Sequence, residues 1–321
     1  GVSGGAPGGG GAAPATVQFS IADVSVSESA GSATVTITRS SGTGGATVRV
    51  QSAPGTAGSP GDFTAVDVTL TFAEGETSKT VAVPIVDDFF AEPSETFTLT
   101  LSEPTQATLG TPSTSTVTIT DDADVCSSTA AHPFTDVPAS NVHNGSIACA
   151  FELDLTEGTS ATTYSPELPV SRAQMATFIA NVLEKIGFAL PANPPDAFDD
   201  DNGINHELAI NQLAALGIIQ GQGGRIYNPS GNVSRGQMAR FLVGAYEAAT
   251  GTNATPQSDH FGDDNGSTFE TDINTGFELG LFIGTSPTTY SPTVNVRRDQ
   301  MATFLVRLVD ALAEAGKPPV A

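Results

Sequence analysis

The sequence predicts a multidomain protein in which an all-β antiparallel sandwich is followed by a mainly α array of three similar units. Two observations support this prediction. Residues 17–124 alternate β-branched and polar residues with a period of two, as half-buried strands do. Beyond residue 125, one pattern recurs three times at a fixed offset, which is typical of a stacked repeat. With 321 residues, the chain is long enough to bury at least two hydrophobic cores.

The amino-terminal part divides into a leader and a sandwich. Residues 1–16 are rich in Gly, so on their own they are expected to behave as a flexible coil. Residues 17–124 contain seven β-branched runs, such as ATVTITRS and STVTITDD, with Gly, Pro and Asp between them. Short strands separated by turn residues predict an immunoglobulin-like antiparallel sandwich.

Acidic residues gather where the predicted strands end. Ca²⁺ takes roughly six to eight oxygen ligands, and carboxylates from several strand ends can converge to supply them. The alternative is that each carboxylate is solvated and caps its own turn. The candidate metal ligands are Glu28, Asp62, Asp87, Asp88, Glu92, Glu95, Asp121, Asp122 and Asp124.

The runs VSVSESAGSATVTITRS, TFAEGETSKTVAVPIVDD, EPSETFTLTLSEP and TVTITDDAD resemble a Calx-beta domain over nearly all of residues 17–124. This resemblance implies that the carboxylates meet at one end of the sandwich and bind calcium.

The second part is built on a repeat. VSRAQMATF begins at residue 170, VSRGQMARF at 233 and VRRDQMATF at 296, which is an offset of 63 residues each time. Each unit is expected to contain a Phe-Asp loop, a helix, a glycine turn, a Tyr-x-Pro loop and a second helix with one apolar face. The predicted units are residues 125–190, 191–253 and 254–321.

The second helices begin with recognisable signals. Ser171-x-x-Gln174 and Ser234-x-x-Gln237 are predicted capping boxes, whereas Arg297 replaces the serine in the third unit. The first helical residue is an arginine each time, although the helix dipole disfavours a cation there. Either these arginines and the free helix N–H groups bind a carboxylate or similar anion, or each pairs with an acidic residue of this chain. They are Arg172, Arg235 and Arg298.

The three units are similar to S-layer homology domains, because FDD at 198, LGIIQG at 216, YNP at 227 and VSRGQ at 233 fall in that family's order. The resemblance covers roughly residues 132–315. It implies a pseudo-threefold bundle whose grooves bind a cell-wall polysaccharide, often a pyruvylated one. By position, the three arginines would contact the acidic sugar, and the opposite wall would be the glycine turns at Gly158, Gly221 and Gly284.

The two cysteines are expected to form a disulfide. The repeat maps Cys149 onto Gln212 and Thr275, so the cysteine stands on a face that is polar in the other units. Such a cysteine suggests half of a bridge to Cys126, which would pin the linker to the first helix of the array. Two reduced thiols are the alternative. A bridge implies an oxidising compartment.

Other patterns predict no further site. FDDDNG at 198 and FGDDNG at 261 lack the EF-hand spacing and its closing glutamate, so turn and helix-cap roles are expected. Four histidines are too dispersed for a metal set: His132, His143, His206 and His260. No catalytic motif is recognisable, and the protein is expected to be non-enzymatic.

Charge and composition narrow the partners. A net charge of −23 repels nucleic acid and anionic lipid surfaces, and no run approaches the length of a membrane span. The chain begins at Gly1, so we expect a signal peptide to have been removed and the protein to reach the cell surface or wall. The favoured function is anchoring to cell-wall polysaccharide. The alternative is a homo-oligomer or polymer, such as an S-layer, sheath or filament, joined through the leader or a sandwich edge strand.

Overall fold

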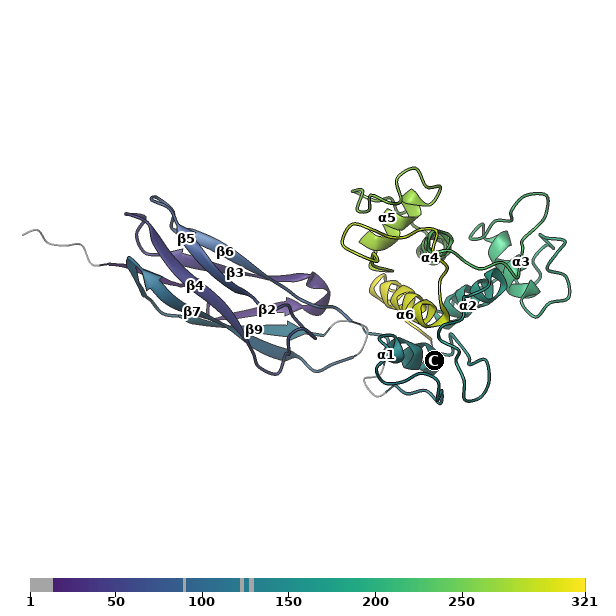
Figure 1. Cartoon of the computed structure of the whole chain (residues 1–321), viewed down its shortest axis with the longest axis horizontal. Helices are drawn as coiled ribbons and strands as arrows, with labels where there is room; N and C mark the ends of the chain where they lie inside the picture. Colours follow the sequence, from purple (N-terminus) through teal and green to yellow (C-terminus); the bar gives the residue numbers. More distant parts are fainter. Residues whose placement is uncertain (1–13, 89–90, 122–123, 127–129, 321) are drawn as a thin grey trace, which may run out of the picture. The chain divides into compact units, whose positions relative to one another are not determined.

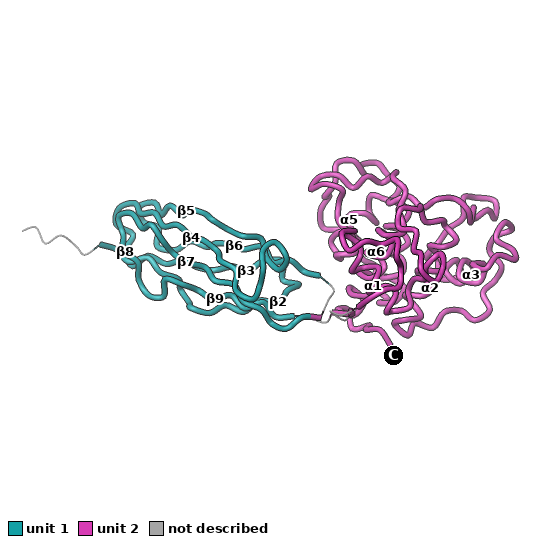
Figure 2. Tube along the Cα trace, turned by 60° about the horizontal axis from the view of Figure 1, so that its bottom comes forward, with its two compact units in different colours: residues 1–88, 92–122 teal, residues 89–91, 123–321 magenta. Residues whose placement is uncertain are grey.

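The computed structural model describes residues 14–88, 91–121, 124–126 and 130–320 (Figure 1). The chain divides into two compact units (Figure 2). The first consists of Gly1–Asp88 and Glu92–Asp122, and the second of Phe89–Ala91 and Ala123–Ala321.

The first unit is a two-sheet sandwich, as predicted. The four-stranded sheet has the order β6-β3-β1-β8, and the five-stranded sheet has the order β2-β9-β7-β4-β5. The strands are β1 (Ala15–Phe19), β2 (Asp23–Ser27), β3 (Ser32–Arg39), β4 (Ala46–Pro54), β5 (Asp67–Phe72), β6 (Ser78–Pro84), β7 (Glu95–Thr105), β8 (Ala107–Leu109) and β9 (Thr114–Thr120).

The alternating apolar residues of these strands form one core between the sheets. Val17, Phe19, Val48 and Val50 are fully buried there. The rings of Phe63 and Phe97 stack with their centroids 4.1 Å apart. The alternation that predicted the strands therefore also sets which face of each strand is apolar.

The first predicted strand is in fact two. Ser20 still donates from its backbone to Thr36 of β3, but the carbonyl of Ala22 accepts from Thr116 of β9. The chain thus changes sheets between these residues. As a result β1 pairs in parallel with β8, and β2 pairs in parallel with β9, while the remaining pairs are antiparallel.

The start of the sandwich also differs from the prediction. β1 begins at Ala15, so the last residues of the predicted leader belong to the sheet. Ala15 and Thr16 pair with Ala107 and Thr108 of β8. Residues 1–13 of that leader lie outside the described residues.

The second unit contains six helices in three pairs among its described residues. The first helices of the three repeats are α1 (Asn144–Glu152), α3 (Glu207–Ala215) and α5 (Glu270–Glu278). The second helices are α2 (Arg172–Lys185), α4 (Arg235–Thr250) and α6 (Arg298–Glu314). Within the described part of the chain, no helix is both long enough and apolar enough to cross a bilayer.

The helices pack as a ring. α3 packs on α2, α5 packs on α4, and α1 packs on α6, so each first helix lies against the second helix of the preceding unit. The three second helices also contact one another at the centre (Figure 1). This arrangement confirms the predicted pseudo-threefold array.

Three valines close the ring at the backbone level. Val170 N–H donates to the carbonyl of Val296, Val296 N–H to that of Val233, and Val233 N–H to that of Val170. Each N···O distance is 2.9 Å. All three valines are fully buried, so these bonds are shielded from water. We call this set the valine triangle.

The predicted capping boxes are present. Gln174 N–H donates to Ser171 Oγ at 3.2 Å, and Ser171 N–H donates back to Gln174 Oε1 at 3.0 Å. Ser234 and Gln237 repeat this exchange in α4. In α6, Gln300 N–H instead donates to Asp299 Oδ1 at 2.8 Å. Asp299 therefore replaces the capping serine that Arg297 displaced.

The predicted disulfide joins Cys126 to Cys149 of α1, with 5.5 Å between the Cα atoms. Both residues are buried in the hydrophobic core of the array. The bridge holds the segment before the first repeat against the first helix.

Candidate binding sites

Each repeated arginine is the first residue of its helix and inserts into the next unit of the ring. The guanidinium of Arg172 donates from Nε to the carbonyl of Tyr227 at 2.8 Å and from Nη2 to the carbonyl of Gln220 at 2.9 Å. In return the Tyr227 hydroxyl donates to the carbonyl of Arg172 at 2.9 Å. The guanidinium carbon lies 4.4 Å from the centre of the tyrosine ring.

The same exchange occurs at the other two junctions. Arg235 bonds the carbonyls of Tyr290 and Ile283. Arg298 bonds the carbonyls of Tyr164 and Glu157, which joins the third unit to the first. The three arginine–tyrosine pairs therefore link the units in a closed cycle.

These contacts were not foreseen by either sequence interpretation. The Nε and Nη2 donors bond backbone carbonyls and not a carboxylate. Arg172, Arg235 and Arg298 are only 4 to 5% exposed. Burial lowers the pKa of each arginine, and the carbonyl dipoles and tyrosine faces stabilise the buried positive charge.

The three predicted wall glycines have a packing role. A Cβ at Gly221 would lie 2.6 Å from a ring carbon of Phe198, and one at Gly284 would lie 2.6 Å from a ring carbon of Phe261. A Cβ at Gly158 would clash with Phe134 in the same way. Any larger residue would push the turn away from the phenylalanine beneath it.

Asp154 replaces a glycine of the turn that precedes Gly158. It has φ of +59°, whereas its equivalents Gly217 and Gly280 have φ of +74° and +72°. The left-handed conformation is thus kept in the first unit with a side chain that tolerates it.

One groove brings together residues of all three units. Arg172 comes from the first unit, Gln220 and Arg240 come from the second, and Phe269 and Asp272 come from the third. The hollow has a volume of about 450 Å³. Its lining residues are Arg172, Ile218, Gln220, Gly221, Gln222, Gln237, Arg240, Phe241, Thr268, Phe269 and Asp272.

The lining combines charge with aromatic surface. Arg240 Nη1 lies 3.1 Å from Asp272 Oδ1, and the Arg240 side chain remains 39% exposed. With Arg172, the ionisable lining groups carry two positive charges and one negative charge, a net charge of +1. Phe241 and Phe269 add ring faces to this groove. The groove can therefore hold a polar, anionic ligand with flat apolar patches.

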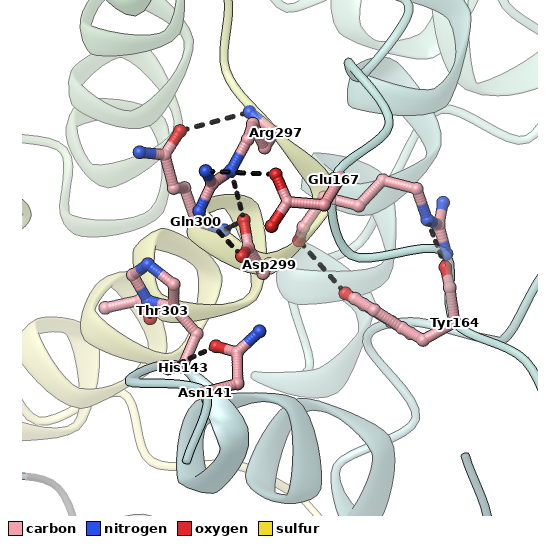
Figure 3. A network of polar contacts seen from close by, with 9 residues as sticks. Asn141, His143, Tyr164, Glu167, Arg297, Asp299, Gln300 and Thr303 are labelled. Carbon is pink, nitrogen blue, oxygen red and sulfur yellow. Dashed lines mark hydrogen bonds and ion pairs between the residues drawn. The ribbon is translucent and has the colours of Figure 1, made fainter. Parts of the chain in front are cut away.

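At the other two junctions between units, a histidine stands in the place of Phe269 and a threonine in the place of Arg240. Thr177 Oγ1 lies 2.7 Å from His206 Nδ1, and Thr303 Oγ1 lies 2.8 Å from His143 Nδ1. Figure 3 displays the second of these contacts beside the α6 cap, where Arg297 also pairs with Glu167 at 3.2 Å. The repeat therefore departs from symmetry at the groove.

The groove residues Arg240, Phe269 and Asp272 were missed by sequence reasoning. A signal was present, because Arg240 stands where the other units have Thr177 and Thr303. Matching residues in a repeat maintain the fold, whereas a departure in one copy identifies a candidate for a different role.

A second candidate site lies on the sandwich. Asp62, Glu92 and Glu95 each offer a carboxylate oxygen within 4.8 Å of the others. Glu28 and Asp121 line the same small hollow. Glu28 is 6% exposed, and Asp121 Oδ1 accepts from Glu92 N–H at 2.9 Å. We call these five residues the sandwich acidic cluster.

The carboxylates of this cluster repel one another. Burial, then a hydrogen bond with Asp62 and the negative charges of Asp62 and Glu92, raise the pKa of Glu95 from 4.5 to about 7. Burial also raises the pKa of Glu92, followed by the charges of Asp88, Asp62 and Asp121. A hard divalent cation would remove this repulsion, so the donor set fits Ca²⁺.

The remaining predicted ligands do not line this hollow. Asp87 and Asp88 are exposed and do not line the hollow. Asp122 lies outside the described residues. Asp124 follows the sandwich and is assigned to the second compact unit.

Comparison with family models gives two matches. Residues 12–123 match the Calx-beta domain, and residues 133–176 and 197–239 match the S-layer homology domain. The second set covers the first two of the three repeats.

Similar proteins include bacterial S-layer proteins and an enzyme. An S-layer protein of Bacillus thuringiensis subsp. finitimus is 28% identical over 174 residues, which is 54% of this chain and 21% of that protein. An endoglucanase of Bacillus sp. (strain KSM-635) is 30% identical over 183 residues, which is 56% of this chain and 19% of that enzyme. The alignments thus span about a fifth of these relatives.

A solved structure resembles the sandwich. The apo form of the Calx CBD1 domain is 27% identical, with a TM-score of 0.33, and the match covers 34% of this chain and 98% of that domain.

Proposed function

Because the chain consists of a Calx-beta domain followed by S-layer homology domains, we propose that it is a non-enzymatic cell-surface protein that binds cell-wall polysaccharide. The ligand site in this proposal is the groove lined by Arg172, Arg240 and Asp272. The S-layer proteins among its relatives support the location. The endoglucanase match does not extend the proposal to catalysis, since it covers only 19% of that enzyme.

The groove favours an anionic saccharide. A sugar carboxylate would be attracted by the net positive lining, and Arg240 can donate two parallel hydrogen bonds to it. The faces of Phe241 and Phe269 suit the apolar faces of sugar rings. Arg172 contributes its positive charge to the groove and not these two donors, because its Nε and Nη2 atoms already bond backbone carbonyls. A pyruvylated polysaccharide has this combination of groups.

Binding to purified wall polysaccharide tests the proposal. The full chain should be retained, and Arg240→Gln should weaken retention about tenfold or more, because one charge-assisted contact is lost. Arg225→Gln is the matched control, since Arg225 is a half-exposed arginine of the same unit that lies outside the groove. Equal retention of both variants would place the ligand elsewhere, and no retention of the native chain on any wall fraction would refute the function.

The sandwich acidic cluster supports a calcium-stabilised domain in this proposal. Glu28, Asp62, Glu92, Glu95 and Asp121 would hold the ion. Bound Ca²⁺ would supply positive charge that offsets the repulsion between these carboxylates. The fold brings these carboxylates together, because the β4–β5 loop, the start of β7 and the end of β9 lie at the same end of the sandwich.

Self-assembly is a second candidate function. Among the described strands, β5 lies at the edge of the five-stranded sheet and pairs there with β4 alone. An edge strand accepts a strand from another chain through its free backbone groups. Val68→Lys, at a position that is 39% exposed, should then prevent ordered polymers seen by electron microscopy. A variant without residues 1–13 tests whether the leader is the joint instead, because it leaves β1 complete. Loss of polymers in this variant would identify the leader as the joint.

A further inference from the structure

The groove contains an ion pair at two positions that are neutral at the other junctions between units. Arg240 of α4 contacts Asp272 of α5, where the second and third units meet. The repeat identifies the residues that stand at these two positions elsewhere in the ring. In the same order, they are Thr303 and Ser146 at one junction, and Thr177 and Ala209 at the other.

The junctions do not need an ion pair here in order to pack. Thr303 Oγ1 donates to Ser146 Oγ at 2.7 Å, so a neutral hydrogen bond joins α6 to α1 at the same place. At the junction of α2 and α3, Ala209 has no polar side chain at all. Because neutral residues serve twice, the charges of Arg240 and Asp272 indicate a role beyond packing.

Asp272 engages only part of the Arg240 guanidinium. Among the described residues, one hydrogen bond joins them, from Arg240 Nη1 to Asp272 Oδ1 at 3.1 Å. The Arg240 side chain is 39% exposed, whereas the Asp272 side chain is 13% exposed. A guanidinium carries several N–H donors, so this single contact leaves others for a ligand in the groove.

The Asp272 carboxylate opposes an anion in this groove. With Asp272 ionised, the lining groups have a net charge of +1, and with Asp272 neutral they have a net charge of +2. Arg172 and Arg240 stay charged in both cases, because a guanidinium keeps its proton. A ligand carboxylate that approaches Arg240 is therefore repelled by Asp272 and competes with it for the same cation.

Burial makes Asp272 easier to protonate than an exposed aspartate. It raises the pKa of the Asp272 carboxyl above the ordinary value of 3.8, and the hydrogen bond and positive charge of Arg240 offset only part of that effect. Helix α5 packs on α4, so both helices were searched for other charges. None of their other titratable residues lines the groove, namely Arg235, Tyr246 and Glu247 of α4 and Glu270 and Glu278 of α5.

We propose that Asp272 regulates the groove, because its carboxylate limits the affinity for an anionic saccharide and its protonation releases Arg240 to the ligand. This inference rests on the function proposed above. A bound anion favours the neutral form of Asp272, so binding takes up a proton, and by reciprocity the affinity rises as the pH falls. A sugar carboxylate in water keeps its charge to a lower pH, since burial has not raised its pKa.

Binding of the full chain to purified wall polysaccharide tests this proposal. The Kd is measured for the native chain and for Asp272→Asn, whose amide oxygen still accepts a hydrogen bond from Arg240. Near neutral pH the variant should bind about threefold to fivefold more tightly, because one repelling charge is gone. Glu270→Gln is the matched control, since it removes one negative charge from α5 outside the groove and should leave the Kd nearly unchanged.

A pH series separates regulation from a structural effect. As the pH falls from about 7.5 toward 4.5, the difference in Kd between the native chain and Asp272→Asn should narrow, because Asp272 becomes neutral in the native chain. On polysaccharide whose carboxyl groups have been reduced to alcohols, the two chains should bind alike. Asp272→Ser, which copies Ser146, should also bind the untreated polysaccharide more tightly and guards against a folding defect in one variant.

Three results would overturn the regulation and leave the proposed function standing. Weaker binding by both variants would show that the carboxylate positions Arg240 for the ligand. Equal binding by the variants and the native chain would show that Asp272 has no influence, and a difference that does not narrow with acid would exclude its protonation as the cause. If the native chain binds no wall fraction, the proposed function fails and the regulation fails with it.

Discussion

Arg298 and Tyr164 bond each other in both directions, although 134 residues separate them in the sequence. Arg298 Nε donates to the tyrosine carbonyl at 2.8 Å, and the tyrosine hydroxyl donates to the arginine carbonyl at 3.1 Å. This pair closes the ring, because it ties the last second helix to the first unit. Loss of this pair should therefore lower the stability of the whole array.

Replacing Arg298 by Lys should destabilise the array by about 2 to 4 kcal/mol. A lysine carries one compact ammonium group, which cannot reach the carbonyls of both Tyr164 and Glu157 in the guanidinium geometry. Urea unfolding followed by circular dichroism measures the change. Arg225→Lys, at an exposed ion pair, should leave the midpoint nearly unchanged, and equal effects of the two substitutions would contradict a special role for the closing pair.

Removing the disulfide should cost the array about 3 kcal/mol, because the bridge closes a loop with a sequence separation of 23. Cys126→Ser/Cys149→Ser is compared with the native chain by thermal unfolding, with and without reductant. The variant should melt lower and no longer respond to reductant. A native chain whose melting temperature is insensitive to full reduction would argue against this contribution.

Acid should weaken the array at two of its junctions. Burial lowers the pKa of His206, and burial together with Arg297 and Arg307 lowers that of His143, although Asp299 opposes the change. The folded protein therefore favours the neutral form of both imidazoles. As the pH falls, these histidines are protonated at a higher pH in the unfolded chain than in the folded one. The associated stability is present above about pH 6.5 and is lost as the pH falls below it.

Unfolding midpoints at pH 5 and pH 7.5 check this prediction. The native chain should lose more stability on acidification than His143→Gln/His206→Gln. His260→Gln is the control, since His260 contacts Glu278 within the third unit and lies at neither junction. The prediction fails if the double variant shows the same acid response as the native chain.

The sandwich should respond to pH in the opposite direction when calcium is removed. The pKa of Glu95 is raised to about 7, so the folded sandwich holds this proton more tightly than the unfolded chain does. In EDTA, stability should rise as the pH falls from about 7 toward 4.5. Ca²⁺ should raise the melting temperature at pH 7.5, and Glu95→Gln should weaken both effects. An unchanged melting transition in EDTA at pH 7.5 would show that calcium does not stabilise this domain.

Much of the fold follows from the sequence because the patterns that specify it are local. The period-two alternation predicts the sandwich, and the repeat around Met175, Met238 and Met301 predicts the paired helices. The change of sheet between Ser20 and Ala22 was missed, although the apolar residues shift there from odd positions, such as Phe19, to even ones, such as Val24. The Asp299 cap was also missed, because Asp299 lies two residues after Arg297, the position where a capping serine was expected.

The sites were harder to predict for a physical reason. Arg172, Arg235 and Arg298 bond backbone carbonyls, and every residue offers a carbonyl, so no sequence pattern identifies the partner. Asp201 and Asp264 were interpreted as turn residues, because their burial depends on packing that the loop motif does not encode. An informative signal was the contrast of Arg240 with the threonines at the same position of the other two units.

The valine triangle limits how this part of the chain can grow. An open solenoid can gain or lose copies at its ends, because each copy touches only its neighbours. Here the valine of the third copy accepts a hydrogen bond from the valine of the first copy, so the ring is closed and a fourth copy has no free valine to bond. An array of only two copies would leave valine backbone groups without their partners. The number three is thus set by geometry, and we expect the copies to melt together in a single transition despite their repeated sequence.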